Sequence, residues 1–235
     1  MTRTLLAIHG RYAGALEFDR CKAFFPEQID FQAFDLPGFG VLNEINRKIK
    51  PFDYANFLHR RSNKLSKPMF LLGVDTGCLI ALEYAQHYPN EIAGLILHSF
   101  PFDLISGNIL ESLIKSVSGE GKRFAFINVL DDYTQRFQHN YQQSNPSRKQ
   151  IERLFNNQWF SSLPSVQAIE TAYLNGSGNR PFTQKEEDSL KKVTSKYSTV
   201  IIPNWKAFPA IETPGDFAQE VTALIEQMNS PLHRF

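Results

Sequence analysis

The chain has 235 residues, and its content of 42% hydrophobic and 21% charged residues is typical of a folded globular protein and excludes a disordered one. Its 25 basic and 24 acidic residues give a net charge of +1, so it has no general electrostatic attraction for nucleic acid or an anionic membrane. No apolar run reaches the length of about 18 residues that a membrane span needs, and the N-terminus lacks the layout of a signal peptide. Two cysteines are too few for a disulfide framework. We therefore expect a cytoplasmic protein that binds neither nucleic acid nor membrane, while the sequence leaves its oligomeric state open.

Apolar runs of strand length alternate with helix-type segments along the first hundred residues. We expect strands at residues 5–9, 29–35, 69–74 and 93–99, with helices around residues 18–25, 54–65 and 79–88. Strands that are apolar throughout and alternate with helices are typical of a parallel sheet covered on both faces.

The C-terminal part continues the same pattern. Further strands are expected at residues 167–175 and 199–203, followed by a helix that Thr213 caps and Pro214 opens, with Asp216 at its third position. Together with the first half, this predicts an α/β fold with a mostly parallel, doubly wound sheet of about six strands.

The middle of the chain, residues 104–163, is richer in Asn, Gln, Ser and Arg. It holds helix-like pieces at 109–117 and 148–159 and a possible strand at 124–129. We interpret it as an insertion into a single domain that covers residues 1–235, and not as a separate domain.

The segment Gly73-Val74-Asp75-Thr76-Gly77 joins an expected strand directly to an expected helix. A Gly-x-nucleophile-x-Gly turn at such a corner is so tight that its outer positions must be small. The central side chain then stands at a helix N-terminus, where the helix dipole and free N–H groups favour an anion. Asp75 is therefore the first candidate site residue.

The segments around this turn resemble the α/β-hydrolase family over nearly the whole chain outside the insertion. Ile8-His9-Gly10-Arg11 is similar to the family's oxyanion loop, and Asp35-Leu36-Pro37-Gly38-Phe39-Gly40 to its "D-x-P-G-x-G" turn. Residues 85–97 resemble the helix, proline and strand that follow the nucleophile turn in this family. Residues 208–214 resemble the family's last loop. The resemblance implies an α/β-hydrolase fold that lacks the N-terminal hairpin and carries a helical lid in residues 104–163.

The resemblance also implies where a catalytic triad would lie, and this sequence departs from it at each position. The nucleophile position is Asp75, the acid position is Asn179 and the histidine position is Ala207. Because acyl transfer needs a base to move protons, standard serine-hydrolase turnover is not expected. The resemblance implies no cofactor and no metal.

Two functional hypotheses remain open from the sequence. In the first, the chain is a pseudoenzyme that binds a small, largely apolar molecule over Asp75, with further site residues Arg11, Tyr12, Thr76, His98 and Lys206. In the second, Asp75 is a general base or a nucleophile in altered chemistry, either as a lyase, cyclase or isomerase, or as a hydrolase of an ester, epoxide or alkyl halide. Haloalkane dehalogenases and epoxide hydrolases of the family use an Asp nucleophile. A purely structural role for Asp75, paired with Lys206 or Arg11, is the third possibility.

Overall fold

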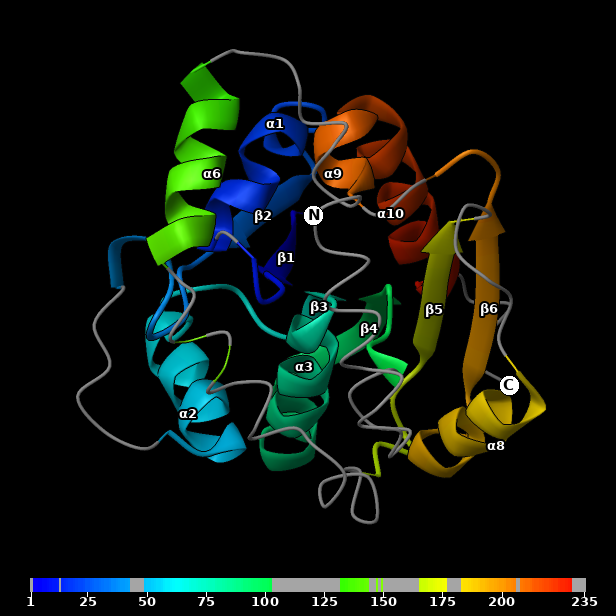
Figure 1. Cartoon of the computed structure of the whole chain (residues 1–235). Helices are drawn as coiled ribbons and strands as arrows, with labels where there is room; N and C mark the ends of the chain where they lie inside the picture. The colour runs from blue at the N-terminus through cyan, green and yellow to red at the C-terminus, as the bar shows by residue number, and fades with distance from the viewer. Residues whose placement is uncertain are drawn as a thin grey trace.

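The computed structural model describes residues 2–12, 14–42, 49–102, 132–143, 147, 149, 165–176, 183–205 and 208–229 (Figure 1). Six strands form one sheet in the order β2-β1-β3-β4-β5-β6, and every neighbouring pair is parallel. The strands are β1 (Arg3–Ile8), β2 (Ile29–Ala33), β3 (Met69–Val74), β4 (Ile92–His98), β5 (Thr171–Gly176) and β6 (Tyr197–Ile202). The predicted doubly wound sheet is therefore confirmed.

Helices cover both faces of this sheet, as parallel strands require because their crossover connections run over the faces. The helical elements are η1 (Gly14–Phe18), α1 (Asp19–Lys22), η2 (Gly40–Leu42), α2 (Pro51–Arg61), α3 (Thr76–His87), η3 (Pro89–Glu91), α6 (Asp132–Gln143), α8 (Gln184–Val193), α9 (Pro209–Glu212) and α10 (Pro214–Met228). Helices α2, α3 and α8 contribute to the apolar core on one face, and α1 and α10 to the core on the other.

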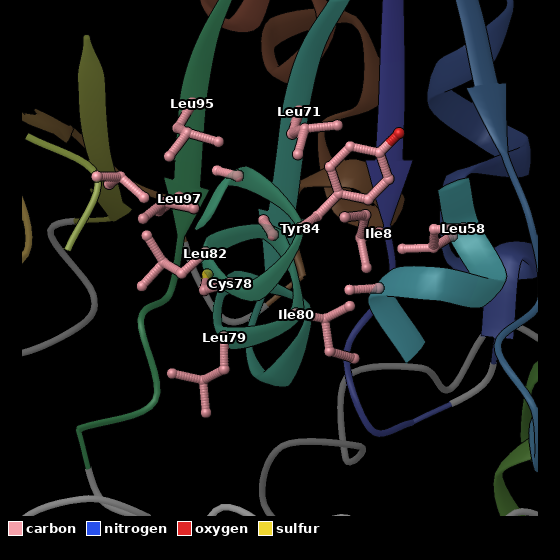
Figure 2. Close-up of a cluster of buried hydrophobic side chains, with 14 of the residues drawn as sticks. Ile8, Leu58, Leu71, Cys78, Leu79, Ile80, Leu82, Tyr84, Leu95 and Leu97 are labelled. Atoms are coloured by element: carbon pink, nitrogen blue, oxygen red, sulfur yellow. The ribbon is translucent and has the colours of Figure 1, made fainter. Parts of the chain in front are cut away.

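Helix α3 lies at the centre of the first core. Residues 76–85 are all buried, since α3 packs on the sheet on one side and on α2 on the other. Figure 2 shows its Cys78, Leu79, Ile80 and Leu82 side chains among apolar residues of the strands and of α2. A helix that is apolar around most of its surface is stable only when it is buried on most sides. The burial of α3 therefore fixes the position of Asp75, which precedes it at the carboxyl end of β3.

The C-terminal helix α10 forms the second core with the opposite face of the sheet. Phe217, Val221 and Ile225 are fully buried there. Thr213 and Pro214 occupy the expected N-cap and first positions, but the Thr213 side chain does not cap the helix. Its hydroxyl donates instead to the Pro209 carbonyl of α9 at 3.5 Å, because α9 ends immediately before α10 begins.

Several segments differ from the sequence-based expectation. Helix α8 was not expected, and β6 begins two residues before the predicted strand. The pieces predicted at residues 109–117, 124–129 and 148–159 lie outside the fully described part of the chain, and α6 is the helix described within residues 104–163. Among the described helices, none has both the length and the apolar character needed to cross a membrane.

Phe217→Ala should lower the free energy of unfolding by about 3–5 kcal/mol, because it leaves a cavity between α10 and the sheet. Phe24→Ala is the matched control, since Phe24 is 58% exposed, and should cost less than about 1 kcal/mol. Urea denaturation of both variants measures the difference. Equal losses would show that α10 does not contribute to the core in this way.

Candidate functional site

The corner between β3 and α3 has the strained geometry that its sequence predicts. Asp75 directly follows β3 and precedes α3, with φ 50° and ψ −122°. A positive φ is uncommon for a residue with a side chain and costs on the order of 1–3 kcal/mol, so the surrounding structure must enforce it. Asp75 is 6% exposed, and the corner therefore presents its carboxylate inside the protein and not to bulk water.

Glycines on either side allow this corner to form. A Cβ on Gly73 would lie 2.6 Å from the Cα of Cys78, and one on Gly77 would overlap the carbonyl oxygen of Ile8. Both obstacles are backbone atoms that cannot move aside. The small residues of the motif are thus needed because β1, β3 and α3 meet here without intervening side chains.

The Asp75 carboxylate is bound by Arg11, which follows β1. The Arg11 Nε donates to Oδ2 at 2.9 Å and its Nη2 donates to Oδ1 at 3.0 Å, which is the two-pronged geometry of a strong guanidinium–carboxylate pair. The main-chain N–H of Arg11 donates to Oδ2 as well, at 3.3 Å. The two side chains are only 8% and 9% exposed, so the pair is buried.

The loop that carries Arg11 is held in place by His9 and Gly10. The Leu36 N–H donates to His9 Nε2 at 3.0 Å, so the proton of the ring lies on Nδ1, which donates to the Gly10 carbonyl at 2.6 Å. Burial lowers the pKa of His9, which favours this neutral ring. A Cβ on Gly10 would lie 2.9 Å from the Cβ of Asp75, so a glycine is needed for the loop to approach the corner.

This arrangement uses the donor that the family resemblance assigns to an oxyanion. The expected role of the Arg11 N–H is to bind negative charge that develops on a substrate, and here it donates to the protein's own carboxylate. Asp75 also makes no side-chain cap to α3, because its carboxylate is directed to Arg11. Of the two partners that the sequence left open, the structure shows Arg11, and Lys206 lies outside the described residues.

Tyr12 and Thr76 lie next to the pair in the chain. Tyr12 is 5% exposed, and its ring packs edge-on against Phe208 at 5.2 Å. Thr76 begins α3 and is fully buried, and among the described residues its hydroxyl has no hydrogen-bond partner. Its N–H belongs to the first turn of α3, whose N–H groups lack acceptors within the helix.

From their positions in the sequence, His98 and His139 are the histidines that would reach the site and replace the missing base, but no hydrogen bond joins either ring to Asp75 among the described residues. The His98 ring packs against Trp205 and Phe217 on the face covered by α10, and its burial lowers its pKa to about 3. His139 of α6 lines a cleft of about 690 Å³ between α6 and η2. Among the described residues, no histidine ring nitrogen hydrogen-bonds the Asp75 carboxylate, and the triad-equivalent positions Asn179 and Ala207 fall outside them.

Glu17 of η1 also contacts this loop and was not among the site residues predicted from the sequence. Glu17 is 1% exposed and its Oε2 accepts the Gly10 N–H at 3.2 Å. Burial, opposed by that hydrogen bond and reinforced by the nearby Asp75 charge, raises the pKa of Glu17 to about 8. The only signal in the sequence was a single acidic residue inside the apolar segment that runs from Gly14 to Phe18.

Apolar side chains from distant parts of the chain gather beside Arg11. This group, named here the Phe137 cluster, combines one residue of α6 with residues of the first loop, η1 and the α9 region: Tyr12, Leu16, Phe137, Phe208 and Ile211. Helix α6 is further attached by the Tyr133 hydroxyl, which donates to the Leu16 carbonyl at 2.9 Å. Helix α6 therefore packs against η1 and the residue after Arg11, and it lies beside α1 (Figure 1).

The sequence profile of the α/β-hydrolase fold family matches residues 3–174, which include the corner, the Arg11 loop, strands β1 to β4 and the first four residues of β5. The chain belongs to the α/β-hydrolase fold family. No curated protein sequence matches it.

Solved structures of α/β hydrolases have the same fold. A thermophilic esterase from Thermogutta terrifontis is 16% identical, with a TM-score of 0.71 over 98% of this chain and 92% of that one. A laboratory-evolved variant of potato epoxide hydrolase is 16% identical, with a TM-score of 0.72 over 96% and 93%. A candidate lipase from Acinetobacter baumannii is 20% identical, with a TM-score of 0.75 over 97% and 84%. At these identities the comparison establishes the α/β-hydrolase fold and not the reaction.

Arg11→Met should lower the free energy of unfolding by about 3–5 kcal/mol, because it leaves a buried carboxylate without its guanidinium. The double variant Arg11→Met/Asp75→Asn should lose less than the single one, since it removes both charges. Lys191→Met, which breaks an exposed pair with Asp188, should leave stability nearly unchanged. Urea denaturation measures all three, and an Arg11→Met protein as stable as the parent would contradict the assignment.

Proposed function

We propose that this α/β-hydrolase-fold protein binds a small, largely apolar molecule in a pocket over Asp75 and does not carry out standard serine-hydrolase turnover. The proposal is supported mainly by one observation, the binding of the Asp75 carboxylate by the side chain and main chain of Arg11. A nucleophile must direct an oxygen at the substrate, whereas both oxygens here already accept hydrogen bonds from Arg11.

The charge of the site favours a neutral ligand. Arg11 and Asp75 cancel, and Glu17 with its pKa raised to about 8 is mostly uncharged at pH 7. An anionic ligand would compete with Asp75 for the same donors, and a cation would face Arg11. The aromatic and aliphatic side chains of the Phe137 cluster pack beside this neutral pair, and such side chains line most small-molecule sites.

The alternative, altered chemistry at Asp75, is supported by a different observation. Asp75 keeps the positive φ of a nucleophile corner, a strained conformation that a purely structural carboxylate does not need. Asp75 could then act as a nucleophile toward an ester, epoxide or alkyl halide, or as a general base for a lyase, cyclase or isomerase. Either role would use Oδ1, which accepts one N–H of Arg11 and keeps a second lone pair, whereas Oδ2 accepts two.

Thermal unfolding with short- and medium-chain alkyl esters, epoxides and alkyl bromides tests the binding proposal. A molecule present at 100 times its Kd should raise Tm by about 5 °C or more and be recovered unchanged. This increase in Tm should persist in Phe24→Ala, because Phe24 lies on the surface. It should be smaller in the double variant Arg11→Met/Asp75→Asn. Intact-protein mass spectrometry separates the alternatives: a stable adduct on Asp75 supports the nucleophile, and turnover that is lost in Asp75→Asn rejects the binding proposal.

Restoring the missing groups tests the alignment that supports the proposal. Asp75→Ser, Asn179→Asp and Ala207→His together should introduce hydrolysis of p-nitrophenyl butyrate. Arg11→Met should be added to these changes, because Asp75→Ser removes the carboxylate that neutralises the guanidinium. The main-chain N–H of residue 11 remains as a donor. The same variant with Ala207 retained is the control, and activity at least about tenfold above it is expected, since the base contributes several powers of ten. Equal rates would show that residue 207 is not the histidine position.

A further inference from the structure

The buried Glu17 carboxyl group accepts the N–H of Gly10, the residue before Arg11, and has no role in the proposed binding. We infer that Glu17 is a positioning residue: by accepting the Gly10 N–H it holds the loop in the orientation that brings Arg11 to Asp75. The inference goes beyond the proposed function, because it applies equally whether the site binds a molecule or transforms one.

The geometry of two consecutive peptide groups supports this role. The Gly10 N–H donates to Glu17 Oε2 at 3.2 Å, and the next N–H in the chain, that of Arg11, donates to Asp75 Oδ2 at 3.3 Å. These two bonds hold two consecutive peptide groups of the loop, one to Glu17 and one to Asp75. The His9 ring holds the Gly10 carbonyl at 2.6 Å, so few rotations of the Gly10 peptide groups remain.

Glu17 is itself held by elements outside the loop. Its 3-10 helix η1 is attached at one end to the Asp35 carboxylate, which accepts the Ala15 N–H at 2.7 Å. It is attached to α6 through the Leu16 carbonyl, which accepts the Tyr133 hydroxyl at 2.9 Å. Three hydrogen bonds, joined by the main chain between Leu16 and Glu17 and between Gly10 and Arg11, thus connect α6 to Asp75.

Among the residues that the structure describes, the titratable groups that interact electrostatically with Glu17 are Asp75, Cys21 of α1, Cys78 of α3 and Tyr133 of α6. Burial raises the pKa of Cys21 to about 12 and raises the pKa values of Cys78 and Tyr133 as well, so these three stay neutral near pH 8. Glu17 is therefore the group among them whose charge changes as pH passes about 8. At neutral pH its protonated form accepts the Gly10 N–H without placing a second negative charge beside Asp75.

Amide hydrogen exchange tests the positioning role. Glu17→Leu should increase the exchange rates of the Gly10 and Arg11 amides by at least about tenfold, because the loop loses its acceptor. Glu17→Gln keeps an acceptor oxygen and should restore the parental rates, and Asp19→Asn, an exposed acid on the adjoining α1, should not change them. Unchanged rates in a folded Glu17→Leu protein, or rates in Glu17→Gln as fast as in Glu17→Leu, would overturn the inference.

A pH titration tests the same contact in the parent protein, with the conservative variant Glu17→Gln as its control and without Glu17→Leu. The Gly10 amide chemical shift should titrate with a midpoint near pH 8 in the parent and not in Glu17→Gln. Because the native pKa lies above the unfolded value of 4.5, the unfolded chain releases this proton first and the parent loses stability as pH rises. Relative to Glu17→Gln, its unfolding equilibrium constant should increase up to about tenfold per pH unit between about pH 4.5 and pH 8. A Gly10 shift that does not change across this range would contradict the role of Glu17 as its acceptor.

Discussion

The buried ion pair between Arg11 and Asp75 is the interaction on which the chemistry of this corner depends. A residue at positive φ after β3 is strained, and a carboxylate at that position is costly to bury unless it is paired and hydrogen-bonded. Arg11 satisfies both needs with three N–H groups from one residue. The same contacts that make Asp75 tolerable inside the protein also occupy about three of the four acceptor positions of its carboxylate, so stability and reactivity at this site are opposed.

The loop around Arg11 is built to maintain that pair. His9 connects the loop to the turn after β2, Gly10 allows close approach to Asp75, and Glu17 accepts the Gly10 N–H. Each contact is made inside the protein, where a hydrogen bond is stronger and an unpaired group is more costly than at the surface. These contacts connect Glu17 and His9 to Asp75 through the main chain of Gly10 and Arg11, which is the basis for the inferred positioning role of Glu17.

The sequence predicted the sheet well, because a parallel strand buried on both faces is apolar throughout. Residues 69–74 were predicted with the bounds that β3 has, whereas α8 was missed, since its ten residues are mostly charged and few of them are buried. At the site, the sequence identified the corner from its glycines but could not choose a partner for Asp75. The sequence also could not show on which face of the sheet the His98 ring lies. Side chains alternate along a strand, so Leu97 packs in the core with α3 and His98 packs with Trp205 and Phe217 on the other face. Glu17 was missed because a single acid in an apolar segment shows its burial only in three dimensions.

The position of the Asp75 carboxylate is also the reason that we propose binding and not ester hydrolysis. In ester hydrolysis, the Arg11 N–H would stabilise negative charge that appears only in the transition state. Here that N–H donates to a permanent carboxylate, so a substrate oxyanion would have to displace Asp75 and would lie beside a second negative charge. A neutral molecule packed against the Phe137 cluster requires neither change. Chemistry at Asp75 would thus use Oδ1, which accepts one N–H of Arg11 and keeps a second lone pair, while the contacts that fix the Gly10–Arg11 loop hold Oδ2 to the other two.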